Sequence, residues 1–498
     1  MSELFDLLVV GGGINGVGIA RDAAGRGLKV LLCEKGDLAG ATSSASSKMI
    51  HGGLRYLEHG AFRLVRESLA EREVLLATAP HLVRPMRFVL PHGPRSRPRW
   101  MVRAGLFFYD RLGGARSLSA AGAVDLRDGP LGAPLRARQD GFVYSDCVVD
   151  DARLVIANAR DAARHGAEIL TRTALAAARR EAGAWRATLT AEDGTAREVA
   201  ARVLVNAAGP WAAEMRALAG LSGPAELRLV KGSHIVVPRL YPHDHAYLLQ
   251  NDDRRVVFAI PFERDYTLIG TTELAAEGPE AADVTEAEIA YLCRAVGRWF
   301  ADPPQPADVV WRFAGVRPLY DDGARSAAAA SRDYVFELDN AGAPALSIFG
   351  GKLTTYRRLA EAALARLAPH LSGAGPPWTA RAPLPGADNL PAGGLAGLVA
   401  ELAQAHPTGD AAMAERLARS YGSDARTILA AAQGGELGDG LLKSEIDWLI
   451  REEWARTADD ILWRRSKLGL RVSSATVAAL SKYLDSAKPR LSDEDKSI

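Results

Sequence analysis

The feature that most constrains this chain is a glycine-rich turn between an apolar run and a helical pattern near its amino terminus. The apolar residues 7–10 stop at Gly11-Gly12-Gly13-Ile14-Asn15-Gly16, and helical spacing begins directly afterwards. Such glycines allow a sharp turn and the close approach of a pyrophosphate, which the first-turn amides of the helix stabilise. A second apolar run, residues 30–33, leads into Glu34, where a carboxylate can accept ribose hydroxyls. The pattern predicts an α/β, Rossmann-like domain that binds a dinucleotide.

The stretch after Glu34 is polar and ends in an arginine, which a simple nicotinamide-binding unit does not require. It reads Thr42-Ser43-Ser44-Ala45-Ser46-Ser47-Lys48-Met49-Ile50-His51-Gly52-Gly53-Leu54-Arg55-Tyr56. Further segments that belong to the same pattern are Tyr144-Ser145-Asp146 with Asp150-Asp151-Ala152-Arg153-Leu154, Asn206-Ala207-Ala208-Gly209-Pro210-Trp211, Lys231-Gly232-Ser233-His234, Gly270-Thr271-Thr272, Gly315-Val316-Arg317-Pro318-Leu319, Phe349-Gly350-Gly351-Lys352-Leu353-Thr354-Thr355-Tyr356 and, in a helical tail, Trp463-Arg464-Arg465. In these segments and their order, the chain resembles the FAD-dependent, quinone-linked aerobic glycerol-3-phosphate dehydrogenases, in the D-amino-acid-oxidase-like class of flavoproteins.

The resemblance implies FAD as the cofactor and names the residues that hold it. They are Gly11, Gly13, Gly16, Glu34, Thr42, Ser43, Ser47, His51, Gly52, Gly53, Gly209, Gly351, Leu353 and Thr354. A reduced flavin carries negative charge at its N1 and C2 carbonyl edge, and the amides exposed by Gly350-Gly351 before a helix start can stabilise that charge. The same glycines are also compatible with a helix start that requires them for packing.

A phosphate-bearing substrate requires fixed cations, and guanidinium groups bind phosphate bidentately. Arg55, Arg317, Arg332 and Lys352 each follow a glycine turn or a strand end, and the resemblance favours the first two. Any one of them alone is also compatible with an ordinary surface cation. The resemblance adds Tyr56 and Thr271 to the predicted substrate site.

Oxidation of a secondary alcohol requires a base for the hydroxyl proton, while the cofactor accepts the hydride. His234 is the candidate base because an imidazole titrates near neutral pH, although Ile235 and Val236 beside it also fit a hydrogen-bonded core histidine. His51 is the competing candidate. Arg317 is the second predicted catalytic residue, since its charge could stabilise a developing alkoxide.

Electrons must then leave the flavin, and the sequence contains no C-x-x-C, haem-attachment or iron–sulfur spacing. The resemblance implies a membrane quinone as acceptor and no metal. Arginines at 95, 97, 99 and 103 surround Trp100 and Met101, ahead of Leu106-Phe107-Phe108-Tyr109, and this mixture suits an anionic lipid surface. The tryptophan-rich segment 448–470 is the alternative membrane contact.

Bulk properties limit the remaining possibilities. At 498 residues the chain is longer than a single hydrophobic core usually serves, so we expect more than one domain. Its net charge of +1 argues against a nucleic-acid partner. The three cysteines are too few for a disulfide framework. The sequence has no run of about twenty apolar residues, so no membrane-spanning helix is predicted. We expect a cytoplasmic protein, peripherally associated with the inner face of the membrane, with a homodimer as a candidate assembly.

Changes in pattern along the chain predict a divided organisation. We expect a FAD-binding domain from residues 1–90, 150–225 and 315–368, a substrate- or membrane-facing insertion at 91–149 and an antiparallel-β substrate domain at 226–314. Eleven of the twenty-six residues at 369–394 are proline or glycine, which predicts a linker, and 395–498 are expected to form a helical cap.

The predicted function is oxidation of sn-glycerol 3-phosphate to dihydroxyacetone phosphate, with FAD as hydride acceptor and quinone as electron acceptor. A glycerol-3-phosphate oxidase that uses oxygen would share these motifs. A non-catalytic FAD-binding protein would keep Gly11, Gly13, Gly16 and Glu34 but would not need Arg55, His234 or Arg317.

Overall fold

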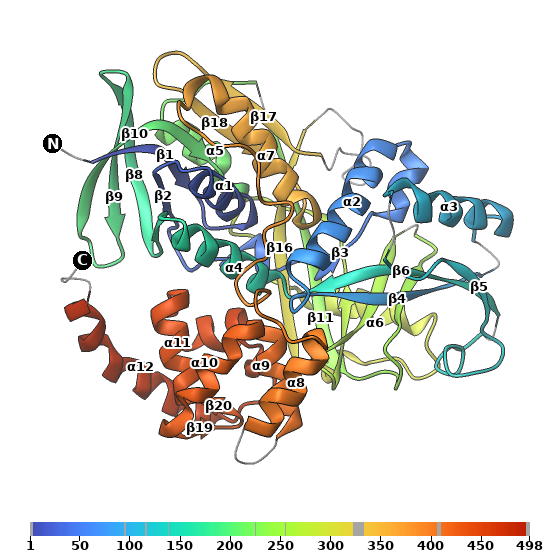
Figure 1. Ribbon diagram of the computed structural model, residues 1–498. Coiled ribbons are helices and arrows are strands. Elements are labelled where there is room, and N and C mark those ends of the chain that lie inside the picture. Colours follow the sequence, from blue (N-terminus) through green and yellow to red (C-terminus); the bar gives the residue numbers. More distant parts are fainter. Residues whose placement is uncertain are drawn as a thin grey trace.

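The computed structural model describes residues 3–93, 96–114, 117–137, 139–224, 226–253, 255–321, 333–405 and 410–494. One β-sheet lies at the upper left of Figure 1, a second and larger one lies on the right, and the carboxy-terminal helices pack at the lower left. The sheets differ in strand direction and in the helices that cover them. This difference determines where a cavity forms.

The smaller sheet is the dinucleotide-binding unit. Its main path runs β17-β18-β10-β1-β2-β7, with parallel pairing from β18 to β7, and the β8–β9 hairpin extends from β10. The strands are β1 Leu4–Val10, β2 Val30–Cys33, β7 Glu168–Leu170, β8 Thr173–Glu181, β9 Ala184–Ala191, β10 Ala196–Asn206, β17 Val335–Asp339 and β18 Ala345–Phe349. Helices α1 (Ile14–Gly25), α4 (Asp151–Arg164) and α7 (Tyr356–Leu367) cover one face, and α5 (Ala212–Leu218) lies on the other.

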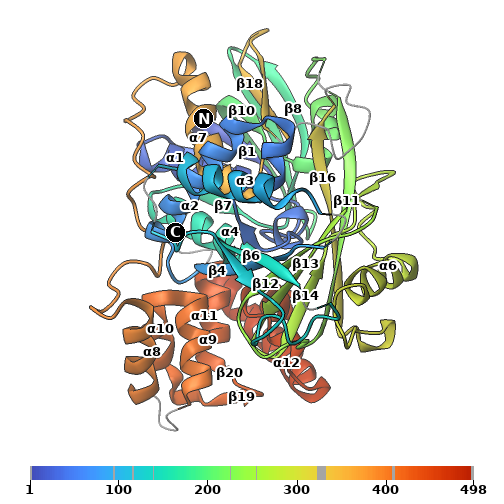
Figure 2. The same cartoon turned by 90° about the vertical axis from the view of Figure 1, so that its right-hand side faces the viewer.

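The larger sheet has the path β15-β11-β14-β13-β12-β4-β6-β3, with β16 added to β11 and β5 added to β6. The strands are β3 Met49–Ile50, β4 Val83–Pro91, β5 Gly122–Asp125, β6 Asp140–Val149, β11 Leu227–Pro238, β12 Ala246–Gln250, β13 Val256–Phe262, β14 Tyr266–Gly270, β15 Leu274–Ala275 and β16 Trp311–Tyr320. Helix α6 (Glu286–Gly297) covers the outer face (Figure 2), while α2 (Phe62–Thr78) and α3 (Arg99–Leu112) pack on the other. Alternation along β11 follows these layers, since Ile235 and Val237 face α6 and Val236 faces α2 and α3.

The carboxy-terminal helices form a core of their own around Leu417, Ile446 and Leu449. They are α8 Gly394–Ala405, α9 Ala411–Tyr421, α10 Ala425–Ala430, α11 Lys443–Glu453, a π-helix at Asp460–Arg465 and α12 Ser474–Glu494, with a small hairpin of β19 Glu436–Gly438 and β20 Leu441–Leu442. Residues 371–393 connect this unit to α7. The connection packs on the FAD-binding unit, because Trp378 lies beneath the Arg21 guanidinium and Leu384 donates to the Thr78 carbonyl.

The structure differs from the predicted division of the chain at two places. Residues 315–320 belong to β16, which pairs with β11 over ten positions and therefore stays in the larger sheet rather than with the FAD-binding strands. Strands β3 and β4 also join the larger sheet, although they fall inside the predicted first FAD-binding part. Such long-range pairing cannot be read from local apolar patterns.

Candidate cofactor and substrate site

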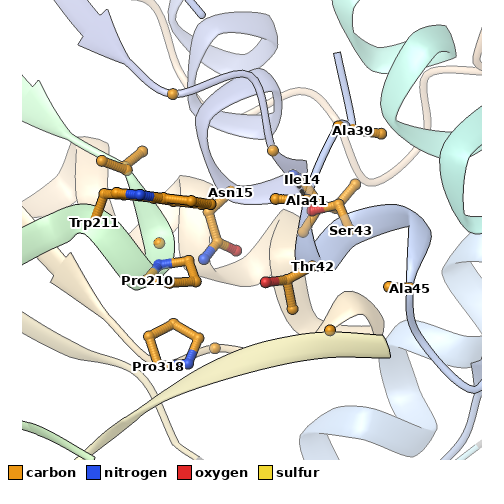
Figure 3. A pocket seen from close by; sticks show the side chains of 18 of the residues that line it. Ile14, Asn15, Ala39, Ala41, Thr42, Ser43, Ala45, Pro210, Trp211 and Pro318 are labelled. Atoms are coloured by element: carbon orange, nitrogen blue, oxygen red, sulfur yellow. Dashed lines mark hydrogen bonds between the residues drawn. The ribbon is translucent and has the colours of Figure 1, made fainter. Parts of the chain in front are cut away.

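A cavity of about 710 Å³ lies where the carboxyl ends of β1, β2, β10 and β18 face the larger sheet. Its walls are the glycine turn after β1, the loop after β2, the turn at 207–211, the loop at 350–354 and residues 315–319 of β16. Figure 3 shows Asn15, Thr42, Ser43 and Pro318 around this hollow. The carboxyl edge of a parallel sheet is where α/β proteins bind nucleotides.

The glycine turn leaves room for a ligand on one side and for the protein on the other. Gly11 has φ +115°, and a Cβ there would lie 2.5 Å from the Ala207 carbonyl oxygen, so this position requires glycine for backbone packing. Gly13 lines the cavity, and a Cβ there would meet only Ser43 Oγ, at 3.1 Å. Gly13 is therefore the glycine whose missing side chain leaves space for the cofactor.

Glu34 joins the first two turns of the cavity wall. Its carboxylate accepts the amides of Gly12 (2.6 Å) and Gly36 (2.8 Å), and burial raises its pKa. The Ile14 amide in the first turn of α1 donates to Ser43 Oγ (3.0 Å). The cradle, the acid after β2 and the cavity volume together fit a dinucleotide such as FAD.

The serine-rich loop is held from below by a buried ion pair. Lys48 Nζ lies 2.8 Å from Asp151 Oδ1, and both side chains are almost fully buried. Asp151 also accepts Ser46 Oγ at 2.7 Å, and Thr42 Oγ1 donates to the Val316 carbonyl of β16 at 2.6 Å. These contacts fix the loop against both sheets, so that Thr42, Ser43 and Ser47 line the cavity.

His234 is fully buried and lies behind Ser47 rather than in the cavity wall. Its Nε2 is 2.9 Å from Ser47 Oγ, and its ring stacks on Phe313 with centroids 5.0 Å apart. Gly270 makes room for this ring, because a Cβ there would lie 2.0 Å from His234 Cδ2. Burial, followed by the charges of Arg317 and Lys48, holds the pKa of His234 well below its usual range, so the imidazole is neutral.

Arg317 and Thr271 meet at Gly232. A Cβ on Gly232 would lie 2.7 Å from both the Arg317 Nη2 and the Thr271 Oγ1, so this glycine gives both side chains their place. Arg317 lines the cavity from β16. A polar side chain and a cation are thus brought together at the side of the cavity that faces the larger sheet.

The loop after β18, residues 350–354, forms another wall of the cavity. Lys352 Nζ lies 3.8 Å above the ring of Tyr56, and the His51 amide donates to Thr354 Oγ1 at 3.3 Å. Asn15 Nδ2 donates to the Gly350 carbonyl at 3.3 Å, which ties this loop to α1. Positive charge and helix-start amides therefore adjoin the cavity where a flavin ring would be stabilised when reduced.

The predicted site residues divide into those that line the cavity and those behind it. The lining set is Gly11, Gly13, Glu34, Thr42, Ser43, Ser47, His51, Tyr56, Gly209, Arg317, Gly351, Lys352, Leu353 and Thr354. Gly16, Gly52, Gly53, Arg55, His234 and Thr271 are not in the lining set. Arg332 lies outside the described residues.

Sequence reasoning missed Glu288, which organises the strand that carries His234. Its carboxylate accepts Ser233 Oγ (2.7 Å), Thr272 Oγ1 (3.1 Å) and Lys231 Nζ (2.9 Å), and it completes a capping box with Thr285 at the start of α6. The buried hydrogen bonds hold its pKa at about 2. The Thr285-x-x-Glu288 spacing is a capping-box signature that could have indicated this residue.

Two general properties of the described part of the chain bear on the site. Its histidine, cysteine and acidic side chains form no group of three or more that could hold a metal ion. Its helices are all too short or too polar to span a bilayer.

Comparisons with known proteins match almost the whole chain. The FAD dependent oxidoreductase family matches residues 6–357, and the C-terminal domain of alpha-glycerophosphate oxidase matches residues 377–497. A glycerol-3-phosphate dehydrogenase from Pseudomonas aeruginosa is 52% identical, over 98% of this chain and 96% of its own. A D-erythritol 1-phosphate dehydrogenase from Brucella abortus is 49% identical, over 97% of this chain and 98% of its own. The solved glycerol-3-phosphate dehydrogenase of Bacillus halodurans, complexed with FAD, superimposes with a TM-score of 0.76 at 27% identity, over 99% and 94%.

Proposed function

The chain belongs to the FAD-dependent glycerol-3-phosphate dehydrogenases, and from that premise we propose that it oxidises sn-glycerol 3-phosphate to dihydroxyacetone phosphate and passes the electrons to a membrane quinone. One observation of the site carries the proposal. A cavity that fits a dinucleotide is also lined by Arg317, Lys352, Tyr56 and His51. These side chains supply both a cation for phosphate and groups for proton transfer.

We propose that the cations lining the cavity bind the phosphate group of the substrate. Arg317 has a guanidinium that can bind phosphate bidentately, and Lys352 adds a second positive charge. Thr271 lies beside Arg317 and can donate a hydroxyl. We keep Arg55 and Arg332 as predicted substrate contacts, with Arg332 outside the described residues.

We propose two routes for removal of the substrate's hydroxyl proton, one through Ser47 and His234 and one through His51. FAD, when bound, accepts the hydride at its N5. Ser47 Oγ reaches the cavity and can pass a proton to His234 Nε2 behind it, since the neutral imidazole has an acceptor nitrogen. His51 offers a direct route from the cavity wall.

A second substrate is favoured by one specific relative. The dehydrogenase for D-erythritol 1-phosphate is almost as similar to this chain as the glycerol-3-phosphate enzymes. Both substrates are polyol monophosphates, so the same cations would bind either. The ratio of kcat/KM for the two compounds therefore identifies the physiological substrate.

Contact with an anionic membrane is proposed for helix α3. Trp100, Phe107 and Phe108 are exposed by 70%, 50% and 56%. Arg103 and Arg111 share the exposed surface of the helix. The opposite side packs inward through Leu106 and Tyr109. An amphipathic helix with aromatic and basic exposed residues is suited to a lipid surface.

The alternative membrane segment offers no comparable face. Trp448 is buried, Trp454 packs against the FAD-binding core, and Trp463 stacks on Trp311 with centroids 4.7 Å apart. Its tryptophans are therefore used in packing. This supports α3 as the lipid contact.

Anaerobic titration tests the proposed reaction. Glycerol 3-phosphate is expected to bleach the bound flavin, and a quinone analogue is expected to restore its colour faster than oxygen does. Fast reoxidation by oxygen alone would indicate an oxidase. Bleaching only by D-erythritol 1-phosphate would reassign the substrate, and no bleaching by either compound would overturn the function.

A further inference from the structure

The carboxy-terminal unit reaches into the cofactor cavity through the π-helix Asp460–Arg465. Arg464 of this helix lines the cavity, although it lies more than four hundred residues after the glycine turn. The comparisons divide the chain between two family matches, and Arg464 falls in the second, whereas the cavity otherwise consists of residues from the first. The cofactor site is thus completed by a different structural unit.

The first contact of the π-helix is with the loop after β2. Arg465 Nη2 donates to Asp37 Oδ1 at 2.8 Å, and Arg464 Nε lies 2.5 Å from Asp37 Oδ2. The Asp37 and Arg465 side chains are 3% and 0% exposed. Asp37 also lines the cavity, three residues after Glu34. Two consecutive arginines therefore fix the loop that contains the predicted ribose-binding carboxylate.

The second contact is with the turn before β8. Asp460 Oδ2 lies 2.7 Å from Arg172 Nη2, and the Asp460 side chain is fully buried. The Arg172 amide donates to the Gly36 carbonyl, and the Thr173 amide donates to the Glu34 carbonyl, both at 2.8 Å. Residues 173–175 line the cavity. The π-helix therefore contacts both the loop after β2 and the turn before β8, which form the cavity walls near Glu34. Backbone hydrogen bonds join these two segments to each other.

The ion pairs of Asp37 with Arg464 and Arg465, and of Asp460 with Arg172, form only when the units are docked. Arg464 bridges Asp37 and Asp460, and Asp460 also accepts the amides of Arg456 and Thr457. Hydrogen bonds and neighbouring arginines hold the pKa of Asp460 below its usual range despite burial, so it stays ionised. Separation of the units would leave Asp37 without Arg464 and Arg465, and Asp460 without Arg172, so docking and the conformation of the loop are coupled.

We propose that the carboxy-terminal unit is a working part of the FAD site, with Arg464, Arg465 and Asp460 as positioning residues for the loop at 34–40 and the turn at 171–173. Undocking of this unit would release both walls around Glu34. Because binding linkage is reciprocal, bound FAD must in turn stabilise docking of the unit. The inference rests on FAD as the cofactor and is independent of the substrate.

Cofactor affinity tests the inference with a matched pair of variants. Arg464→Gln is expected to weaken FAD binding to the reconstituted apoprotein at least tenfold, measured by quenching of flavin fluorescence. Arg451→Gln is the control, since Arg451 pairs with Glu452 inside the carboxy-terminal unit, and its FAD affinity is expected to stay within twofold of wild type. Arg172→Gln removes the second contact from the other side and is expected to act like Arg464→Gln.

Proteolysis measures the reciprocal effect. FAD is expected to slow cleavage within residues 371–393 in wild type, and this protection is expected to shrink in Arg464→Gln and Arg172→Gln but not in Arg451→Gln. Folded variants that bind FAD with wild-type affinity would overturn the proposal. Weaker FAD binding with full protection would also overturn it, because Arg464 would then act only as a local part of the cavity wall.

Discussion

Ser47 Oγ lies 2.9 Å from Nε2 of His234, and this hydrogen bond connects the buried histidine to the cavity. The imidazole lies between Gly270 and the ring of Phe313, and among the described residues its Nδ1 has no hydrogen-bond partner. His234 can therefore influence a substrate only through Ser47. The hydroxyl and the imidazole are expected to act as a unit.

Removal of either member of this pair is expected to slow flavin reduction to a similar extent. Ser47→Ala and His234→Gln should each lower the anaerobic rate about a hundredfold, the usual range for loss of a proton-transfer group. The double variant should be no slower than the singles, because the two side chains lie on one route. Stopped-flow absorbance of the flavin measures all three rates.

The competing route gives a clear contrary result. If His51 accepts the proton directly, His51→Gln will be the slow variant, and both Ser47→Ala and His234→Gln will reduce their flavin at near-native rates. Flavin content of each variant serves as the control, since Ser47 and His51 both line the cofactor cavity.

Burial of neutral His234 is expected to make the fold acid-sensitive. Burial lowers its pKa, and the charges of Arg317 and Lys48 lower it further, whereas the unfolded chain has the ordinary value of 6.5. Below pH 6.5 the unfolded chain binds a proton that the folded chain does not, so the free energy of unfolding falls as the pH falls. The loss grows as the pH falls below 6.5, by up to about 1.4 kcal/mol for each pH unit over which the folded imidazole stays neutral.

His234→Gln has no such proton uptake. Urea unfolding at pH 7.5 and at pH 5 should therefore show a smaller loss for His234→Gln than for wild type. Equal losses in the two proteins would mean that His234 titrates normally in the folded state. His165→Gln is a suitable control, because that histidine is partly exposed at the C-cap of α4.

Substitution in the glycine turn is expected to separate cofactor binding from folding. Gly13→Val would fill space in the cavity, and the nearest protein atom to its Cβ would be Ser43 Oγ at 3.1 Å. We therefore expect a folded protein without FAD, measured by circular dichroism and by the flavin-to-protein absorbance ratio. Gly11→Val would drive a Cβ into the Ala207 carbonyl and should also lower stability. Stoichiometric FAD in purified Gly13→Val would contradict the cradle.

Arg317 is expected to provide binding energy for the phosphate group. Arg317→Gln should lower kcat/KM for glycerol 3-phosphate by roughly 2 kcal/mol, about thirtyfold, as for a lost charge-assisted pair. Activity with unphosphorylated glycerol should change little. Arg312→Gln on the same strand is the control, since its half-exposed side chain pairs with Glu286 on α6. Equal losses for both substrates would place Arg317 in another role.

Local patterns predicted those parts of the fold that depend on local chemistry. The apolar run at 30–33 is strand β2 with those bounds, because turns delimit it on both sides. The glycine turn and Glu34 likewise carry their own signature. The pairing of β16 with β11 and the 428-residue separation between Asp37 and Arg465 depend on tertiary contacts, which no local pattern contains. Ile235 and Val236 indicated that His234 could be a hydrogen-bonded core histidine, whereas its partner Ser47 depends on a tertiary contact.

Helix α3 provides the last prediction, which separates membrane contact from chemistry. Each arginine near an anionic surface contributes up to about 1 kcal/mol, and salt screens this term, whereas insertion of Trp100, Phe107 and Phe108 is largely salt-resistant. Replacement of the arginines at 95, 97, 99 and 103 by Gln should therefore lower the salt-sensitive part of binding to vesicles rich in phosphatidylglycerol. Arg95 lies outside the described residues, and Arg97 directly precedes the N-cap of α3. Replacement of the three aromatic residues by Ser should remove the salt-resistant part.

Vesicle sedimentation at low and high salt measures both parts. Both variants should also lose turnover with membrane quinone while substrate still bleaches their flavin at the wild-type rate, because α3 does not line the cofactor cavity. Leu274→Ser with Val310→Ser is the matched control, since these side chains are 37% and 51% exposed on other elements. If the control loses as much binding as the α3 variants, lipid contact is a general property of the surface. If neither α3 variant loses any, the helix faces solvent and the quinone is reached from another side.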